Sequence, residues 1–254
     1  MRYVLARANR HLLAGFAGSR MLLALDFDGT LAPIVADPER AAMRPSTRRL
    51  LRQVARAYPC VIISGRARAD VRRRVRGLGV LEVIGNHGLE PGRATAPALR
   101  QVRRWVPLLE RSLSRVPGVT VEDKGPSLAV HYRRSPAKRA ARARILAAAA
   151  GLGEVRLVRG KQVVNILPRG APHKGLALER VRARLGCKTA VYVGDDETDE
   201  DVFALGRSGR LLGIRVRRRR GTAAAAYIRT QAEIDRLLRA LLAFRVRSSR
   251  VEAP

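Results

Sequence analysis

The feature that most constrains the fold of this chain is the alternation of short apolar segments with helical ones. Residues 21–27, 60–63 and 80–84 are apolar and of strand length, and the segments at 45–57 and 69–75 have the spacing of helices. Strands that alternate with helices form parallel sheets, because each connection has to return across the sheet before the next strand begins. We therefore predict an α/β fold with a parallel sheet.

The same alternation returns near the C-terminus, but the middle of the chain differs from both ends. Strand-like segments at 190–194 and 211–216 precede an amphipathic helix at 231–244. The middle combines strands near Gly and Pro turns with two helices, expected at 119–122, 127–132, 155–158 and 162–167 for the strands and at 98–113 and 136–150 for the helices. We expect an inserted α+β segment, with core residues 1–93, inserted residues 94–170 and core residues 171–254.

The charge of the chain is unusual. Its 51 Lys and Arg residues against 21 Asp and Glu give a formal net charge of +30, and only five of the basic residues are Lys. Aromatic residues make up 4%, too few for a surface that stacks nucleic-acid bases, and the arginines are spread along the sequence. We interpret the charge as an Arg-biased composition of solvated faces, without a specific nucleic-acid partner. The alternative is a basic field that attracts anionic substrates and polyanions.

Cysteine usage and hydropathy bear on the compartment. Cys60 and Cys187 lack the spacing of a metal or redox motif, and two isolated cysteines fit buried thiols in a reducing cytosol. No apolar run reaches the roughly 18 residues that a membrane span needs. Arginines interrupt the first 20 residues, so we expect no signal peptide but a short amphipathic helix that leads into the first strand. We expect a cytoplasmic protein that does not bind membranes.

The strongest chemical signal is the sequence Asp26-Phe27-Asp28-Gly29-Thr30 at the end of the first apolar segment. Ligands of open α/β sheets bind beyond the carboxyl ends of the strands, where two carboxylates this close can act on one reacting centre. Asp26 can attack phosphorus as a nucleophile. Asp28 can protonate the leaving oxygen and later activate water. The alternative, a solvated Asp-x-Asp turn without chemistry, is disfavoured by the preceding strand.

Three further motifs complete a phosphate site. An acidic cluster at 194–201 begins with Gly194-Asp195-Asp196 after another predicted strand, and its carboxylates would repel one another without a cation such as Mg²⁺. An acidic helix N-terminus, favoured by the helix dipole, explains only the later acids of this cluster. Ser64 ends the 60–63 strand and can donate to a phosphoryl oxygen, and Lys174 begins a helix and can bind both Asp26 and phosphate.

These motifs, in this order, resemble those of the haloacid dehalogenase superfamily. Further segments resemble the trehalose-6-phosphate phosphatases, from about residue 22 to residue 242. The segments that carry this resemblance are Leu25-Asp26-Phe27-Asp28-Gly29-Thr30-Leu31-Ala32-Pro33, Ser64-Gly65-Arg66, Gly85-Asn86-His87-Gly88-Leu89-Glu90, Val121-Glu122-Asp123-Lys124-Gly125, His131-Tyr132-Arg133, Gly160-Lys161 and Gly194-Asp195-Asp196-Glu197-Thr198-Asp199-Glu200. The resemblance implies a Rossmann-like haloacid dehalogenase core with a parallel sheet and an inserted α+β cap domain.

The resemblance also implies an activity and a set of residue roles. The chain would be a Mg²⁺-dependent phosphatase that hydrolyses trehalose 6-phosphate through an aspartyl-phosphate, functionally paired with a trehalose-6-phosphate synthase. Asp26 would be the nucleophile and Asp28 the acid/base, and Ser64 and Lys174 would bind the phosphoryl group. Mg²⁺ would be held by Asp26, the backbone carbonyl of Asp28 and Asp195, with Asp196 and Asp199 in support. The sugar side would be formed by Arg66, Asn86, His87, Glu122, Lys124 and Arg133.

One position departs from the family pattern. Asn165 stands in the strand after Gly160-Lys161, where the family usually has Glu. An amide still binds a hydroxyl, but it carries no charge and is a weaker acceptor, which affects the sugar more than the phosphatase chemistry. Strand alternation predicts that Asn165 faces the substrate side while Val164 and Ile166 pack into the inserted segment.

Two alternatives to a trehalose-6-phosphate phosphatase therefore stay open. The position of Asn165 favours a related phosphatase for another glycosyl or sugar phosphate. The charge of +30 favours a polyanion-binding protein with an inactive core. The arginine-rich run at 215–220 could serve such a protein, but it follows a strand and we expect it to be a solvated loop.

Overall fold

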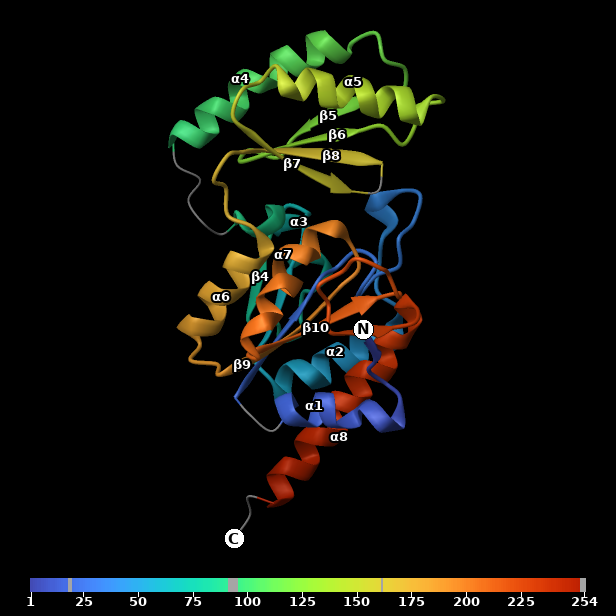
Figure 1. Cartoon of the computed structure of the whole chain (residues 1–254), viewed down its shortest axis with the longest axis vertical. Coiled ribbons are helices and arrows are strands. Elements are labelled where there is room, and N and C mark those ends of the chain that lie inside the picture. The colour runs from blue at the N-terminus through green and yellow to red at the C-terminus, as the bar shows by residue number, and fades with distance from the viewer. Residues whose placement is uncertain (18–19, 91–95, 161, 252–254) are drawn as a thin grey trace. The chain divides into compact units, whose positions relative to one another are not determined.

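The computed structural model describes residues 1–17, 20–90, 96–160 and 162–251 (Figure 1). The chain divides into two compact units. Met1–Gly88 together with His173–Pro254 form the first, which we call the core unit, and Leu89–Pro172 form the second, the inserted unit. The expected boundary between residues 93 and 94 lies outside the described residues. Among the helices that are described, none has both the length and the hydropathy of a membrane span.

The core unit contains a seven-stranded sheet in which every neighbouring pair is parallel. In sheet order the strands are β1 (Arg2–Tyr3), β11 (Ala226–Ile228), β10 (Leu211–Val216), β9 (Thr189–Gly194), β2 (Met21–Leu25), β3 (Cys60–Ile63) and β4 (Glu82–Ile84). The central strand β2 lies between β9 and β3, so segments far apart in the sequence meet at the middle of the sheet. The predicted parallel α/β fold is confirmed.

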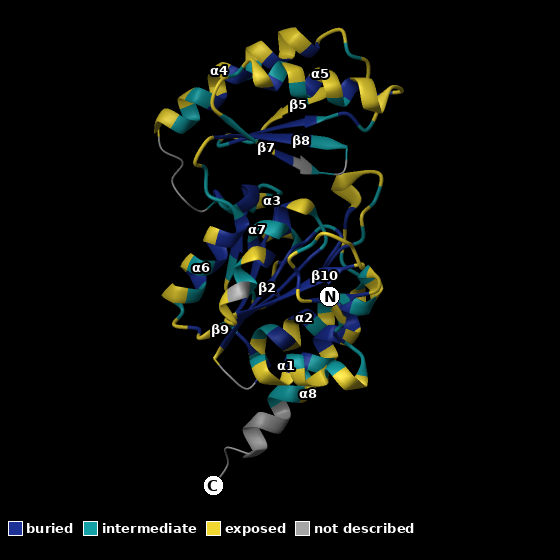
Figure 2. Cartoon of the chain, in the orientation of Figure 1, coloured by how far each residue is buried: buried dark blue, intermediate teal, exposed yellow. Residues whose placement is uncertain are grey.

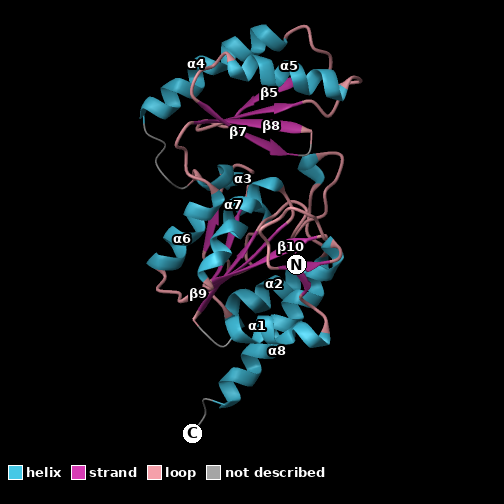
Figure 3. Cartoon of the chain, in the orientation of Figure 1, coloured by secondary structure: helices cyan, strands magenta, loops and turns pink. Residues whose placement is uncertain are grey.

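Helices cover both faces of this sheet (Figure 3). The core helices are α1 (Arg10–Ala17), α2 (Pro45–Ala57), α3 (Arg68–Arg74), α6 (Lys174–Arg184), α7 (Glu200–Phe203) and α8 (Ile234–Val251). Leu23 and Leu25 of β2 pack with residues of α1, α2, α3 and α8, whereas Leu22 and Ala24 pack with residues of α6 and α7. Because both faces are covered, β2 is apolar and buried at every position (Figure 2).

The N-terminal segment contains more than the expected amphipathic helix. That helix is present as α1, which leads into β2. Before it, Arg2 and Tyr3 form β1, which pairs with Ala226 and Tyr227 of β11 at the edge of the sheet. Strands of two and three residues are too short to show an alternating pattern, so neither β1 nor β11 was predicted from the sequence.

In its described residues, the inserted unit consists of an antiparallel sheet and two helices. In sheet order its strands are β5 (Thr120–Asp123), β6 (Leu128–His131), β8 (Val163–Pro168) and β7 (Val155–Gly160). The helices α4 (Ala96–Leu113) and α5 (Lys138–Ala150) pack on one face of this sheet against Val130, Val164 and Ile166. This confirms the alternation predicted for Val164 and Ile166, and it puts Asn165 on the opposite face.

Candidate active site

The site is built at the carboxyl end of β2. Asp26 directly follows this strand, is buried, and continues the sheet by donating its N–H to the carbonyl of Val193 at 2.9 Å. The next residues turn sharply, and Gly29, with φ of +77°, donates its N–H to the carbonyl of Ala32 at 2.8 Å. The turn leaves the side chain of Asp28 partly exposed, whereas that of Asp26 stays in the interior. The two carboxylates of the motif therefore have different surroundings.

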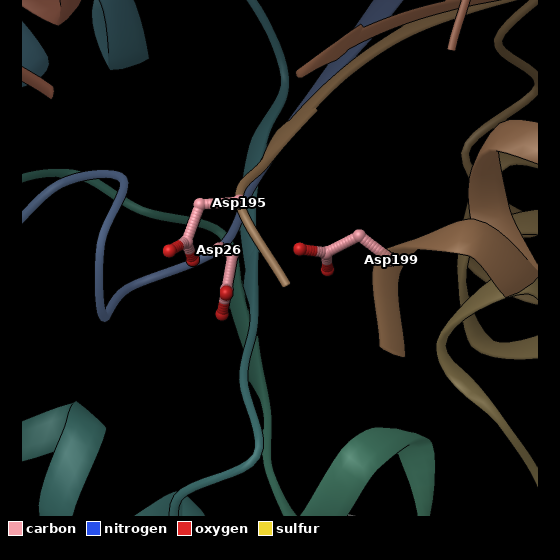
Figure 4. A group of neighbouring side chains, drawn as sticks. All are labelled: Asp26, Asp195 and Asp199. Atoms are coloured by element: carbon pink, nitrogen blue, oxygen red, sulfur yellow. The ribbon is translucent and has the colours of Figure 1, made fainter. Parts of the chain in front are cut away.

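Three carboxylates converge at this strand end (Figure 4). Asp195 follows β9, the neighbour of β2. Asp199 is the last residue of a short 3₁₀ helix, Glu197–Asp199. One oxygen from each of Asp26, Asp195 and Asp199 lies within 4.8 Å of the others. Carboxylate oxygens are the ligands that hard divalent cations such as Mg²⁺ prefer. These residues fit a metal ion. The carboxyl group of Asp195 also approaches the backbone of Gly29 closely, which keeps it beside the end of β2.

That close approach depends on Gly29. A Cβ atom at Gly29 would collide with the carboxyl group of Asp195, and the backbone of Gly29 is also in the left-handed region. Glycine is the residue that adopts this conformation at no steric cost and leaves the space empty. The glycine of the motif thus has two functions, since it forms the turn and lets Asp195 lie against it.

Lys174 is the buried cation of the cluster. Its Nζ lies 2.8 Å from Oδ1 of Asp199 and 3.3 Å from Oδ1 of Asp26. Burial acts to lower the pKa of Lys174, but the two carboxylates outweigh burial and raise it, so the amine stays charged. Burial raises the pKa of Asp26; Lys174 opposes this effect, and the neighbouring carboxylates of Asp199, Asp195 and Asp28 add to it. An additional cation would favour the ionised form of Asp26.

Asp199 connects these groups. Besides Lys174, it accepts hydrogen bonds from the hydroxyl of Tyr192 at 2.6 Å and from the backbone N–H of Asp196 at 2.9 Å. A Cβ at Gly194 would collide with its carboxyl group. Three donors therefore fix one carboxylate beside the proposed metal ligands. The family resemblance implied only a supporting role for Asp199. Tyr192 was not among the predicted site residues, because its position inside an apolar strand carries no signal of a polar contact.

Asp28 is held by Arg66. The guanidinium donates from Nε to one carboxylate oxygen of Asp28 at 2.6 Å and from Nη2 to the other at 2.8 Å. Nη1 donates to Asp70 at 2.8 Å. Burial acts to lower the pKa of Arg66, but the hydrogen bonds to Asp28 and Asp70 outweigh burial and raise it. The expected sugar-side role of Arg66 stays a prediction, while the contact that the structure shows is with the expected acid/base.

Ser64 lies at the same edge of the sheet. It directly follows β3, its side chain is buried, and its Oγ accepts a hydrogen bond from the N–H of Arg66 at 3.2 Å. The next strand, β4, is followed by Asn86 and His87, both buried, with φ of +47° and +58°. A Cβ at Gly65 would collide with the imidazole of His87. The backbone thus folds tightly at this point and brings the 64–66 and 86–87 segments together.

The remaining expected residues belong to the inserted unit. Register pairs Glu122 with Ala129 and Ala129 with Asn165, so Glu122 and Asn165 lie on one face of the sheet with a strand between them. Glu122 bonds to Nε2 of His131 at 2.7 Å, and the buried Asn165 donates from Nδ2 to the carbonyl of Val158 at 3.4 Å. The expected sugar-side residues Lys124 and Arg133 follow β5 and β6. Lys161, from the Gly160-Lys161 motif, lies outside the described residues.

One expectation was wrong. The run at 215–220 was expected to be a solvated loop, but Arg215 belongs to β10 and is 4% exposed. Its guanidinium donates to the backbone carbonyls of Asp195 at 2.6 Å and Asp196 at 3.0 Å. Residues 217–220 are exposed, as expected. The strand LLGIRV is buried at every position, and the exposed arginines that follow it hid the difference between Arg215 and the rest of the run.

Comparison with solved structures defines the class of the fold. The C-terminal domain of the trehalose-6-phosphate phosphatase of C. albicans superposes with a TM-score of 0.76 at 21% identity, over 94% of this chain and 97% of that one. A trehalose-6-phosphate phosphatase related protein superposes with a TM-score of 0.69 at 24% identity, over 89% of this chain and 99% of that one. The fold is therefore the haloacid dehalogenase type, a Rossmann-like core with an inserted α+β domain.

Comparison of sequences then gives the family. The trehalose-phosphatase family profile matches residues 24–226, and the chain belongs to this family. It is 34% identical to the probable trehalose-phosphate phosphatase 4 of Oryza sativa subsp. japonica, over 91% of this chain and 68% of the relative. It is 35% identical to the trehalose-phosphate phosphatase of Mycolicibacterium paratuberculosis, over 79% of this chain and 55% of that longer protein.

Proposed function

We propose that the protein is a Mg²⁺-dependent phosphatase that hydrolyses trehalose 6-phosphate to trehalose and phosphate. The observation that carries this proposal is the group formed by Asp26, Asp195, Asp199 and Lys174 at the carboxyl end of the central strand, in a chain of the trehalose-phosphatase family. Three carboxylates and a buried ammonium combine a nucleophile, cation ligands and a positive charge for phosphate. A non-catalytic polyanion-binding protein would have no use for this group.

The chemistry proceeds in two displacements. An oxygen of Asp26 attacks phosphorus and forms an aspartyl-phosphate, while the bond from phosphorus to the sugar oxygen breaks and Asp28 gives that oxygen a proton. Asp28 then takes a proton from water, whose oxygen attacks the same phosphorus. The bond between Asp26 and phosphorus breaks, and phosphate leaves. Both carboxylates return to their starting states.

Two basic residues prepare these carboxylates. Lys174 lies against Asp26, where its charge favours the ionised nucleophile and attracts phosphoryl oxygens. Arg66 holds both oxygens of Asp28, and a protonated carboxyl group offers fewer acceptor sites than a carboxylate. One of the two Arg66 bonds therefore opens when Asp28 carries the proton. Ser64 contributes a hydroxyl at the same sheet edge.

The metal would be held by Asp26 and Asp195, with the backbone carbonyl of Asp28 as a third protein ligand and Asp196 and Asp199 in support. Bound there, Mg²⁺ would supply positive charge to the phosphoryl oxygens and favour the ionised form of Asp26. Asp199 already has three hydrogen-bond donors, which suits a residue that orients the others. On the sugar side, we propose that hydroxyl groups are bound by Arg66, Asn86, His87, Glu122, Lys124, Arg133 and Asn165.

The test is phosphate release from a panel of sugar phosphates, measured with the full chain. We expect trehalose 6-phosphate to be the best substrate, EDTA to stop turnover, and added Mg²⁺ to restore it. Turnover that persists in EDTA would contradict the metal assignment. Absence of hydrolysis across the panel, with the protein folded, would contradict the phosphatase.

A second substrate class has one observation in its favour. Asn165 replaces the usual Glu, and its amide group is partly engaged by the carbonyl of Val158. If another glycosyl phosphate exceeds trehalose 6-phosphate in kcat/KM by tenfold, which is about 1.4 kcal/mol in the barrier, the protein is a phosphatase for that sugar. The same panel decides between the two substrates. If trehalose 6-phosphate is the substrate, we also propose a functional pairing with a trehalose-6-phosphate synthase.

A further inference from the structure

Arg215 is a buried charge that the proposed reaction does not use. It belongs to the strand β10 and is 4% exposed, in a region of the sheet where its neighbours Ile214 and Val216 are core residues. Removing a guanidinium from water is costly unless hydrogen bonds and an opposite charge compensate. Glu200 supplies the charge, with Oε1 at 2.9 Å from Nη1. The other hydrogen bonds of Arg215 go to the backbone beside the proposed metal ligands.

The guanidinium lies over the first two peptide carbonyls after β9. Register pairs Arg215 with Gly194, the last residue of β9. From there Nη2 donates to the carbonyl of Asp195 at 2.6 Å, and Nη1 donates to the carbonyl of Asp196 at 3.0 Å. Glu200 begins α7, so one side chain connects the end of a strand to the start of the following helix. Both ends of the 195–199 segment are thereby fixed.

The carboxylate of Asp195 is confined from its other side by Gly29. The missing Cβ of Gly29 leaves the space that the carboxyl group occupies. The backbone bond from Arg215 and the contact with Gly29 together determine where Asp195 points. We propose that Arg215 is a positioning residue, which holds the Asp195 peptide so that its carboxylate meets Asp26 around the divalent cation. This inference rests on the proposed function.

The test compares Arg215→Met and Arg215→Lys with the wild type and with a matched control, Arg219→Met. Arg219 is in the same arginine run, but it is 48% exposed and pairs with Glu197, which lies outside the proposed machinery. The measurements on the full chain are Mg²⁺ affinity by calorimetry in the absence of substrate, Mg²⁺ dependence of turnover, and thermal unfolding. Calorimetry separates cation binding from catalysis.

We expect Arg215→Met to weaken Mg²⁺ binding at least tenfold, and excess Mg²⁺ to restore most of its turnover. Arg215→Lys keeps the charge and one direction of donation, so we expect a smaller loss of three- to fivefold. Arg219→Met should bind Mg²⁺ within twofold of the wild type. Weakened cation affinity in a folded variant is the signature of positioning, since a merely structural role would lower thermal stability and leave the affinity unchanged.

The remaining outcomes also test the positioning role of Arg215. If Arg215→Met does not fold, the affinity of Arg215→Lys stands in its place. Wild-type Mg²⁺ affinity in either folded Arg215 variant, or failure of both to fold, overturns the positioning role. If the wild type itself binds no Mg²⁺ or hydrolyses no sugar phosphate, the proposed function fails, and the inference falls with it. The two failures are thus distinguished by the wild-type measurement.

Discussion

Replacing Asp26 and replacing Asp28 should affect turnover in different ways. Asp26→Asn should abolish turnover with the fold retained, because an amide cannot attack phosphorus, while Asp199 keeps its contact with Lys174. Asp28→Asn should keep substrate binding but lose proton transfer, a decrease in kcat of about 10²–10⁴. Steady-state kinetics and thermal unfolding check both variants. Wild-type turnover in either one would exclude the two-step mechanism.

Glycine 29 offers a sharper test of the geometry. Gly29→Ala places a methyl group where the Asp195 carboxyl lies, at a φ of +77°, whereas Gly77 has nearly the same φ, +75°, and nothing within 4 Å of an added Cβ. Both substitutions should cost about 1–2 kcal/mol for the left-handed backbone. Only Gly29→Ala should also lower kcat/KM at least tenfold. Thermal melts measure the destabilisation that the two variants share. Equal kcat/KM in the two variants would contradict a role of the Asp195 carboxylate in the site.

At the residue level, the sequence indicates which residues are polar at strand ends but not how they contact one another. Asp26 and Lys174 were expected to meet, and their 3.3 Å contact confirms this. The hydrogen bonds of Tyr192 and Arg215 were not expected, because both residues belong to strands whose apolar neighbours dominate the pattern. Such contacts depend on the register between strands, which a single sequence does not specify.

At the scale of elements, long periodic segments were predictable and short ones were not. The helix expected at 45–57 is α2 with those bounds, since its apolar positions repeat with helical spacing. The strand expected at 21–27 ends earlier, at Leu25, because the backbone turns after Asp26, and the carbonyl of Phe27 accepts from the N–H groups of Leu31 and Ala32 within that turn. The edge strand β1 and its neighbour β11 contain only two and three residues, and pairing with other strands, β1 with β11 and β11 also with β10, makes them part of the sheet.

The strand β8 carries a prediction of its own. In Asn165→Glu, a carboxylate should bind sugar hydroxyls more strongly than the amide, by about 1–2 kcal/mol. KM for trehalose 6-phosphate should therefore fall about tenfold with kcat nearly unchanged, since the contact is equal in ground and transition states. The melting temperature should also fall, because Glu cannot donate to the Val158 carbonyl. A loss of activity on trehalose 6-phosphate would instead make Asn165 a specificity determinant for another sugar.

For the whole molecule, the charge of +30 predicts how the protein treats polyanions. Any binding to DNA should be independent of sequence and fall steeply with salt, because it would arise from contacts with phosphates and the release of counterions. Its affinity should drop by about 10³–10⁵ between 50 and 200 mM salt if six to ten phosphates are contacted. Titrations of two unrelated duplexes at several salt concentrations measure this. Tight binding that distinguishes the duplexes at physiological salt would contradict the interpretation of the arginines as a solvated composition.

The position of β2 between β3 and β9 also sets the order in which the chain can fold as it is made. Met21 pairs with Thr189, and Leu25 with Val193, so the central strand lacks one neighbour until 168 more residues have been added. At ribosomal rates that delay is about 10–30 s. The inserted unit, Leu89–Pro172, is contiguous and is complete before β9 exists. We expect the inserted unit to be the first part of the chain with native tertiary structure. Until β9 is synthesised, one edge of β2 stays unpaired and accessible to chaperones.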